Sequence, residues 1–301
     1  MKKIILPILL LLLTGSTLLA QVGINTDNSA PDNSAMLDVK STSRGLLPPR
    51  MTTTQMYGIS SPPEGLTIYN TTLNTICWFN GTSWYNWISH DGQNCGSVVY
   101  GGKTYNSVII GMQCWMNENL NIGTAVLGSQ DQANNNIIEK YCYNNIPANC
   151  DVYGGLYQWG EVVQYLNGAT NTTKWEPVPT GNVQGICPEG WHLPSDAEWN
   201  SLATYLGGAS VAGGKMKETG TVHWAAPNTG ATNASGFTGL PGGDRDVSGS
   251  FIFQAIYGDF WAASETNSIQ AWYRNLNTSN ETLYRGGYYK SDGFAARCLK
   301  N

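Results

Sequence analysis

The sequence predicts an α+β fold in which short strands and turns outnumber helices. Three observations support this: the chain contains 35 glycines, aromatic residues make up 11% of it, and charged residues make up only 12%. Glycine favours tight turns and aromatic residues favour strands, so this composition is typical of many short strands. Two separate segments nevertheless show the apolar spacing of a helix, and the elements below follow chain order.

The first twenty residues are predicted to be a signal peptide. Lys2 and Lys3 precede an apolar run over residues 4–13, and the segment ends at the small residue Ala20. A basic start, an apolar stretch of about ten residues and a small residue at the cleavage point are typical of secretion. The run is too short to span a hydrocarbon core ~30 Å thick. We therefore expect a secreted or outer-surface protein without a transmembrane segment in the mature chain.

Residues 21–93 are predicted to form a small β-rich module. Strands are expected at residues 66–69, at residues 76–79 and around Trp84, with a hairpin turn at Asn80-Gly81. About seventy residues with so few core candidates would be marginally stable alone. We expect this module to pack on a neighbour or on copies of itself.

Residues 94–301 are predicted to form a denser second domain. It starts with a strand, a Gly-Gly turn and a strand that runs into an extended segment. A first helix is expected over residues 153–168, where Leu156, Trp159, Val163 and Leu166 recur on one face. Gly168 is the expected end of that helix.

A second helix begins in the stretch GICPEGWHLPSDAEW, residues 185–199. This stretch contains Cys187, His192 and Ser195 among several carboxylates, as a hydrolase site might. Ser195 and Glu198 also have the spacing of a capping box, and an apolar stripe follows them up to Gly207-Gly208. Because Asp196 adjoins Ser195 in the first turn, it cannot readily orient His192 for catalysis. We therefore interpret Ser195 and Glu198 as a helix cap and assign no catalytic residue.

Residues 208–236 are rich in Gly, Asn and Thr and show little periodicity, so a long loop is expected there. Loops of this length in a domain are usually functional or disordered. Short strands are expected after it, in the segments FTGLPGGDRD, GDFWAAS, QAWYRNLN, TLYRGGYY and GFAARCLK.

Six of the seven cysteines are assigned to three disulfides, since pairing is the default in an exported chain. Cys142 and Cys150 surround a turn rich in Pro and Asn, Cys95 and Cys114 flank a predicted hairpin, and Cys187 with Cys298 closes a long loop. Cys77 then has no partner, and is either buried or paired between chains. Spacing alone does not prove this pairing.

The second domain resembles the Fibrobacter succinogenes major paralogous domain, a family found in exported bacterial proteins. The segments that carry the resemblance, in the family's order, are GMQCWMNENL, YGGLYQWGE, GICPEGWHLPSDAEW, FTGLPGGDRD, FWAASE, AWYR and GFAARCL. This family is similar in turn to the C-type-lectin-like fold, which includes the formylglycine-generating enzymes. The resemblance implies two helices, a small twisted antiparallel sheet and a long loop, preceded here by the β-rich module.

The formylglycine-generating enzymes use a cysteine pair late in the domain. Here only Cys298 follows Cys187, and it is already assigned a partner. The resemblance therefore implies the fold without the activity.

The N-terminal module resembles a segment at the start of surface proteins of the Bacteroidota. The pieces that match are VGINT, SAMLDVKSTSRGLLPPRMT, GLTIYNTT and FNGTSW. Similar pieces occur in tail-fibre-like proteins, which suggests a homo-trimer formed through residues 21–93.

A non-catalytic binding or adhesion protein is the first functional hypothesis, with a carbohydrate or a surface protein as ligand. Trp and Tyr rings can stack on sugar faces, and loops on a rigid scaffold commonly carry recognition. The candidate ligand-binding residues on the loop side are His223, Trp224, Asn228, Asp244, Arg245 and Asp246. For any one of them, a place in the core or in a solvated turn is the simpler interpretation.

Calcium is a related hypothesis, because hard cations bind carboxylate and amide oxygens. The candidate ligands are Asn117, Glu118, Asn119, Asp244 and Asp246, and no other cofactor is expected. The alternative for each is an ordinary solvated turn.

Two other functions remain open. The chain could be a structural component of a surface assembly, with the module as stalk and the second domain as head, or an exported hydrolase. The hydrolase needs an acid/base pair that the sequence does not reveal. A net charge of −5 argues against nucleic acid, which needs a basic face.

Overall fold

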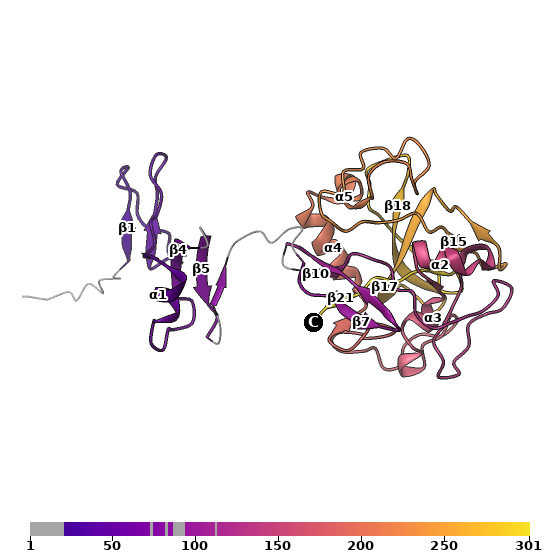
Figure 1. Ribbon diagram of the computed structural model, residues 1–301. Helices are drawn as coiled ribbons and strands as arrows, with labels where there is room; N and C mark the ends of the chain where they lie inside the picture. The colour runs from indigo at the N-terminus through magenta and orange to yellow at the C-terminus, as the bar shows by residue number, and fades with distance from the viewer. Residues whose placement is uncertain (1–20, 73–74, 82–83, 87–93, 112) are drawn as a thin grey trace, which may run out of the picture. The chain divides into compact units, whose positions relative to one another are not determined.

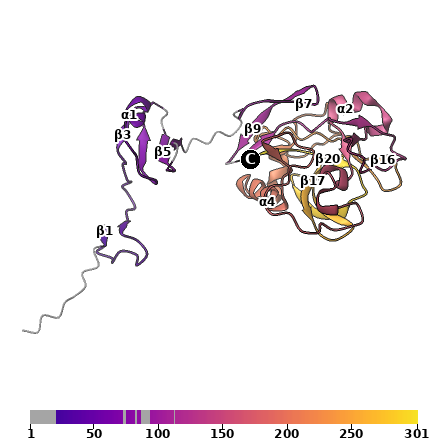
Figure 2. The same ribbon diagram turned by 90° about the horizontal axis from the view of Figure 1, so that it is seen from below.

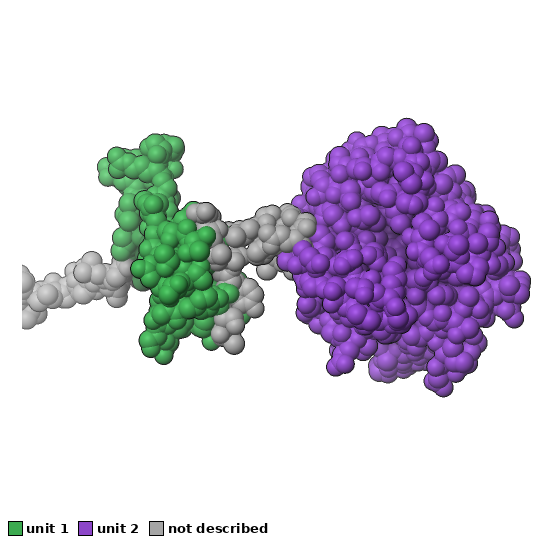
Figure 3. Space-filling model, viewed as in Figure 1, with its two compact units in different colours: residues 1–88 green, residues 89–301 purple. Residues whose placement is uncertain are grey.

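The computed structural model describes residues 21–72, 75–81, 84–86, 94–111 and 113–301, so the predicted signal peptide lies outside the described residues. The chain divides into two units, residues 1–88 and residues 89–301 (Figure 3). Helices and sheets occur together, as the predicted α+β class requires. Within these described ranges, no helix has both the length and the apolar composition needed to cross a membrane.

The first unit contains two small sheets and a short helix. One sheet is a parallel pair, and the other has the strand order β3-β4-β5-β6. The elements are β1 (Val22–Ile24), β2 (Leu37–Val39), β3 (Arg50–Met51), α1 (Thr53–Tyr57), β4 (Thr67–Asn70), β5 (Thr75–Phe79) and β6 (Trp84–Asn86). The three strands expected from the sequence are confirmed as β4, β5 and β6.

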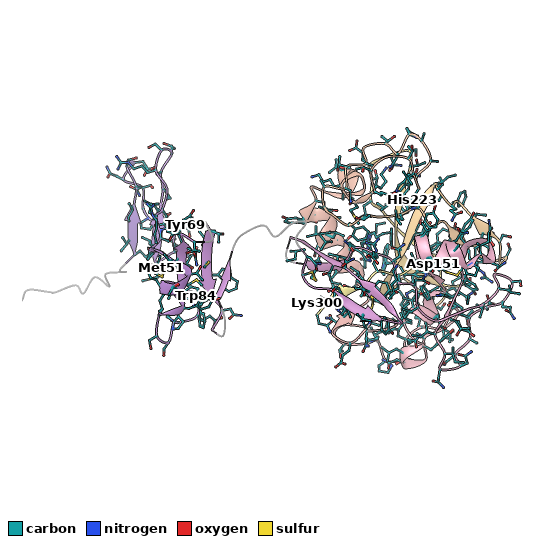
Figure 4. The ribbon with its side chains drawn as sticks, viewed as in Figure 1. Met51, Tyr69, Trp84, Asp151, His223 and Lys300 are labelled. Atoms are coloured by element: carbon teal, nitrogen blue, oxygen red, sulfur yellow. A yellow bond between two sulfur atoms is a disulfide. The ribbon has the colours of Figure 1, made fainter. Side chains whose placement is uncertain are left out.

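The first unit buries little apolar surface. Its core consists of Met56, Ile68 and Cys77, against which Met51 and Trp84 pack (Figure 4). Cys77 forms no disulfide and is buried, and burial raises the pKa of its thiol. Many large apolar side chains are exposed instead, and in the described part of the unit these are Val22, Ile24, Met36, Leu37, Val39, Leu46, Leu47 and Tyr57. The unit therefore leaves more large apolar side chains in water than it buries.

The second unit is organised by a five-stranded and a four-stranded sheet (Figures 1 and 2). The five-stranded sheet has the order β13-β20-β17-β18-β19, with β13 (Leu156–Tyr157), β17 (Tyr257–Glu265), β18 (Gln270–Asn277), β19 (Tyr284–Tyr289) and β20 (Phe294–Ala295). The four-stranded sheet has the order β14-β21-β10-β9, with β9 (Ser107–Ile110), β10 (Gln113–Met116), β14 (Trp191–His192) and β21 (Leu299–Lys300). Early and late strands of the unit therefore lie side by side, since β10 pairs with β21.

Shorter elements complete the second unit. The paired strands are β7 (Val98–Tyr100) with β8 (Lys103–Tyr105), β11 (Thr124–Ala125) with β12 (Glu139–Lys140), and β15 (Asp244–Arg245) with β16 (Phe251–Ile252). The helices are α2 (Pro147–Tyr153), α3 (Trp159–Val162), α4 (Asp196–Tyr205) and α5 (Ala209–Met216), with 3-10 turns at Tyr143–Asn145 and Leu166–Gly168. The expected Gly-Gly hairpin is confirmed as β7–β8, and α4 packs on β17 and β18 (Figure 1).

The central strand β17 lies between two hydrophobic cores. Phe260 and Ala262 belong to one cluster of buried side chains, whereas Trp261 and Ala263 belong to the other. Successive residues of a strand point to opposite faces of the sheet, so each face of β17 is covered by its own core. This explains why the middle of β17 is a continuous run of apolar residues.

The single helix expected over residues 153–168 does not form. The structure has β13, a single turn of α3 and a 3-10 turn in its place. Gln164, Tyr165 and Asn167 adopt left-handed backbone conformations with φ of 53°, 51° and 51°, so the helix ends after one turn at Val162. Leu166 is consequently 40% exposed and does not extend the apolar face.

The expected loop over residues 208–236 begins with a helix, α5, that the sequence did not indicate. The helix contains Gly213 and Gly214, which normally disfavour helices. Added Cβ atoms at these positions would lie 2.5 Å from the carbonyl oxygens of Thr282 and Gly230 respectively. These glycines therefore allow the helix to pack closely against other backbone, and tertiary contact overrides helix propensity.

All three disulfides assigned from the sequence are confirmed. They join Cys95 to Cys114, Cys142 to Cys150, and Cys187 to Cys298. The last of these connects segments 111 positions apart, and both of its cysteines lie in one of the two cores beside β17.

The capping box at the start of α4 is also confirmed. Ser195 Oγ accepts from the Glu198 amide at 3.3 Å, and Glu198 Oε2 accepts from the Ser195 amide at 2.8 Å. Ser195→Ala removes the hydroxyl and should lower the free energy of unfolding by about 1 kcal/mol. Urea unfolding followed by tryptophan fluorescence measures this change. Ser201→Ala, in the middle of the same helix, is the control, and equal stability of both variants would contradict the capping role.

Candidate functional site

The side chains of His192, Ser195 and Glu198, which could suggest catalysis, form hydrogen bonds with one another. Ser195 Oγ donates to Glu198 Oε2 at 2.8 Å. His192 Nε2 lies 2.9 Å from Glu198 Oε1, and His192 Nδ1 lies 2.6 Å from Asn301 Oδ1. A serine–histidine–carboxylate triad instead requires a histidine nitrogen that takes the serine proton. The geometry therefore supports the capping interpretation of Ser195 and Glu198.

A cleft of about 520 Å³ opens beside these residues. Its size lies within the range of roughly 300–1,000 Å³ typical of sites for small molecules. Three stretches of chain line it, and their lining residues are Lys174, Trp175, Val178, Pro179, Gly181, Asn182, Val183, His192, Leu193, Ser195, Glu198, Ala263, Ser264, Glu265 and Thr266. The N-terminus of α4 and the end of β17 thus meet the segment 174–183 at this cleft.

Two carboxylates give the cleft its polar character. Glu265 Oε2 accepts from Lys290 Nζ at 2.7 Å, and this buried ammonium lies 4.2 Å from the centroid of the Trp159 ring. Burial acts to raise the pKa of Glu198, but hydrogen bonds from His192 and Ser195 outweigh it and lower the pKa overall. Glu198 is therefore an ionised hydrogen-bond acceptor at neutral pH.

The other part of the cleft wall is apolar. Trp175 is buried and packs on Trp159 with ring centroids 5.2 Å apart. Its indole Nε1 makes no hydrogen bond, although a buried indole N–H usually finds a partner. Pro179 and Leu193 extend the apolar lining, and Val178, 72% exposed, also contributes. The cleft thus combines aromatic and aliphatic surface with a few polar groups.

The structure buries four of the six ligand-binding residues predicted from the sequence, namely Trp224, Asn228, Asp244 and Arg245. Trp224 is 1% exposed, lies in a core cluster, and its Nε1 donates to the Gly239 carbonyl. The expectation that the loop presents Trp224 at the surface is therefore wrong, because the chain folds back over the helix α5 and its neighbours.

The remaining side chains of this group do not form one site. Asn228 Nδ2 donates to the carbonyl oxygens of Glu218 and Gly220, which shapes the loop locally. His223, labelled in Figure 4, is half-buried, and its Nδ1 lies 2.8 Å from Glu218 Oε2. Arg245 donates to the carbonyl oxygens of Gly128 and Ser291. Their roles in ligand binding stay predictions.

Only some of the expected calcium ligands are engaged by protein groups, because one buried oxygen each of Asn117, Glu118 and Asp244 makes no hydrogen bond. Asn119 Oδ1 accepts from Arg297 Nε at 2.8 Å, and Glu118 Oε2 lies 3.5 Å from Lys103 Nζ. Asp246 Oδ1 accepts from the amides of Ser248 and Ser250 and so stabilises a turn. Among the residues that the structure describes, no group of three or more His, Cys, Asp or Glu is placed to hold a metal. Calcium binding by Asn117, Glu118, Asn119, Asp244 and Asp246 remains a prediction.

A second pocket, of about 160 Å³, lies on one face of the five-stranded sheet. Its lining residues are Asp244, Phe253, Tyr257, Asp259, Tyr273, Asn275, Asn277, Tyr288 and Phe294. Asp259 is paired with Asn275 across β17 and β18, so both side chains share this face. Sequence reasoning selected Asp244 but missed Asp259, although an aspartate inside the apolar segment GDFWAAS was the available signal.

The acids at this pocket have strongly perturbed pKa values. Burial raises the pKa of Asp244 to about 8, and repulsion from nearby Asp259 and Asp292 adds to the effect. Burial also raises the pKa of Asp259 to about 7 and that of Asp292 to about 7. At neutral pH these carboxyl groups therefore retain protons that exposed aspartates would have released.

The raised pKa values should make the second unit less stable as the pH rises from about 4 to about 8. In this window an unfolded aspartate, with a pKa near 3.8, has lost its proton, whereas the folded Asp244 still holds one. The folded state then binds more protons than the unfolded state, so stability is highest below the window and falls as pH rises through it. Asp244→Asn removes one such group and should flatten the dependence, measured as urea midpoints at pH 5 and pH 8.

The control for this experiment is Asp246→Asn, which changes the same charge on the neighbouring turn. Hydrogen bonds from Ser248 lower the pKa of Asp246. That variant should keep most of the wild-type decline between pH 5 and pH 8, because Asp246 adds only repulsion to a rise in the pKa of Asp244 and Asp292 that comes first from burial. A wild-type decline in Asp244→Asn would show that the buried acid does not cause it.

Comparison with known proteins gives a family-model match in each part of the chain. The family model of the Fibrobacter succinogenes major domain matches residues 108–300, and that of the phage tail like trimerisation region matches residues 23–116. No curated protein and no solved structure matches the chain. The first match spans well over half of the 301 residues and includes the α4 capping box and both pockets. The chain belongs to the family of the Fibrobacter succinogenes major domain.

Proposed function

We propose that this chain is an exported, non-catalytic binding protein of the cell surface. Its second unit binds a carbohydrate in the 520 Å³ cleft, and its first unit joins copies of the chain into a trimer. The cleft is the observation that carries the binding role. The match to a trimerisation region carries the assembly role.

The lining of the cleft suits a sugar better than a charged or purely apolar ligand. A sugar ring has apolar C–H faces and hydroxyl groups that both donate and accept hydrogen bonds. Trp175 and Pro179 offer apolar surface, whereas Glu198, Glu265 and Ser264 offer polar groups. A small number of placed polar groups within an apolar wall is the usual design of a pocket for small molecules.

The second unit is also proposed to have a C-type-lectin-like fold. Two features support this assignment: β21, at the end of the unit, pairs with β10 near its start, and α4 packs on the five-stranded sheet. Strands and helices are connected here by long irregular segments, as that fold would require. Export is supported by the predicted signal peptide and by three disulfides, since disulfides persist in oxidising compartments.

Trimerisation is supported by the exposed apolar side chains of the first unit. Leu46 and Leu47 are 72% and 74% exposed, and Met36 is 70% exposed. Burying such side chains between copies would gain about 25 cal/mol for each Å² removed from water. A unit with so small a core of its own would be stabilised by this association.

A glycan array probed with residues 21–301 tests the carbohydrate proposal. We expect selective binding, followed by titration of the best glycan using tryptophan fluorescence. Val178→Arg places a long charged side chain at the cleft and should weaken binding at least about tenfold, a loss of about 1.4 kcal/mol. Val222→Arg is the matched control, because Val222 is 84% exposed and does not line the cleft.

Two outcomes would reject the carbohydrate proposal: no glycan bound by the wild-type protein, or equal weakening by both arginine substitutions. Light scattering on the same protein tests the assembly. Leu46→Ser with Leu47→Ser should shift a trimer towards monomer, whereas Val222→Ser should not. A trimer that binds no glycan would favour the structural stalk-and-head component of a surface assembly over a receptor.

A further inference from the structure

The 160 Å³ pocket on the five-stranded sheet contains an acid with one unpartnered oxygen. Asp244 is 3% exposed, and its buried Oδ1 makes no hydrogen bond. Leaving a buried carboxylate unpaired costs several kcal/mol, which is why such groups are normally paired or neutralised. The Asp244 side chain therefore has an unsatisfied hydrogen-bond acceptor, and a ligand in the pocket would contact this side chain.

Among the described residues that line this pocket there is no cationic side chain, because none of the nine is Lys, Arg or His. Arg245 follows Asp244 directly in the chain, but its guanidinium donates to Gly128, Ser291 and Asp131. Asp259 is nearly as buried as Asp244, and Asn275 Nδ2 donates to its Oδ1 at 2.8 Å. Two buried acids thus line a pocket to which its lining residues supply no positive charge.

The remaining walls of the pocket are aromatic. Tyr273 and Tyr288 have ring centroids 5.2 Å apart, and each also contacts Phe294. Phe253 and Tyr257 pack together at 4.7 Å. Aromatic faces attract organic cations through their negative quadrupole. Calcium instead requires six to eight oxygen ligands, which aromatic rings cannot provide.

We propose that this pocket binds a primary ammonium group on a short alkyl chain, with Asp244 and Asp259 accepting its N–H donors and the tyrosine rings packing on its carbon atoms. A primary ammonium fits better than a quaternary one, because the free Asp244 oxygen needs a hydrogen-bond donor. The group belongs either to a free amine or to a lysine side chain of another protein. This site is separate from the cleft beside α4, since the two share no lining residue.

Calorimetric titration of residues 21–301 with n-butylamine at pH 8 tests the proposal. We expect saturable binding of n-butylamine. The protein should bind n-butanol and tetramethylammonium at least about tenfold more weakly, because n-butanol lacks the charge and tetramethylammonium lacks the N–H donors. Asp244→Asn should weaken the binding of butylamine by roughly thirtyfold or more. Asp151→Asn, at an exposed aspartate outside the pocket lining, carries the same charge change and should bind butylamine as the wild type does.

The unfolding of each variant is measured in parallel. A loss of butylamine binding is then counted only for a variant that is folded. Asp259→Asn gives a second measurement of the same site. Nα-acetyl-lysine methylamide distinguishes the sources: tighter binding than butylamine indicates a protein lysine, and weaker binding indicates a free amine. Unchanged butylamine affinity in folded Asp244→Asn, or equal binding of tetramethylammonium, would overturn the proposal. So would calcium binding that excludes the amine.

Discussion

Replacing Cys187 and Cys298 by alanine is expected to lower the free energy of unfolding of the second unit by about 4.8 kcal/mol. The bond closes a loop across 111 positions and therefore removes much chain entropy from the unfolded state. Both cysteines are buried in the core beside β17, so their loss also removes packing. Urea unfolding of the oxidised proteins, followed by tryptophan fluorescence, gives the difference.

The matched control for this loss is the double variant Cys142→Ala with Cys150→Ala. That disulfide spans only 8 positions, so the same entropy argument gives about 2.6 kcal/mol. Loss of the long-range bond should therefore lower the free energy of unfolding by roughly 2 kcal/mol more than loss of the short-range bond. Equal losses in the two variants would show that chain entropy does not set the contribution of these bonds.

Trp224→Ala is the second large effect, with an expected loss of about 3–5 kcal/mol. The indole is 1% exposed, donates to the Gly239 carbonyl, and lies 5.6 Å from Lys217 Nζ. Truncation leaves a cavity and removes the donor of that hydrogen bond. Thermal or urea unfolding measures the change.

His223→Ala is the control for Trp224, because the neighbouring histidine is only half-buried and contacts Glu218. The His223→Ala substitution should lower the free energy of unfolding much less, by an amount typical of substitutions at partly exposed side chains. A Trp224→Ala protein as stable as the His223→Ala protein would return Trp224 to the list of surface residues that a ligand could contact.

Elements with a local chemical signal could be predicted from the sequence. Ser195 and Glu198 cap α4 because the cap requires only residues three positions apart. The Gly101-Gly102 turn has positive φ at both residues, which glycine adopts readily. The disulfides were also predicted, since the cysteines of a chain expected to be exported are paired by default, and two of the three pairs flank a local turn or hairpin.

Elements set by tertiary contact could not be predicted in this way. The helix α5 contains two glycines that allow backbone to approach, so its composition resembles a loop. Of the helix expected over residues 153–168 only the turn Trp159–Val162 forms, because Gln164 and Tyr165 take left-handed conformations that hydrophobic periodicity does not indicate. Trp224 lies in a stretch rich in Gly, Asn and Thr, yet its ring enters the core.

The candidate sites show the same division. The cleft is assembled from segments around Trp175, Glu198 and Glu265, which are distant in sequence, so no spacing pattern could join them. Asp244 was selected as a ligand-binding candidate, but Asp259, which lines the same pocket, lies on β17 in a different sheet from β15. A bridge between Gly243 and Gly258 brings these two strands together, and no local sequence pattern indicates it.

The bond between Cys187 and Cys298 also affects how the protein responds to proteolysis. It makes a covalent ring of the chain between these two residues, and the ring includes the smaller pocket and the α4 side of the cleft. The segment around Val222, which is 84% exposed, is a natural point of cleavage. One cut there would open the ring without releasing a fragment, so both ends would stay tethered and the nicked protein would keep its mass until reduced.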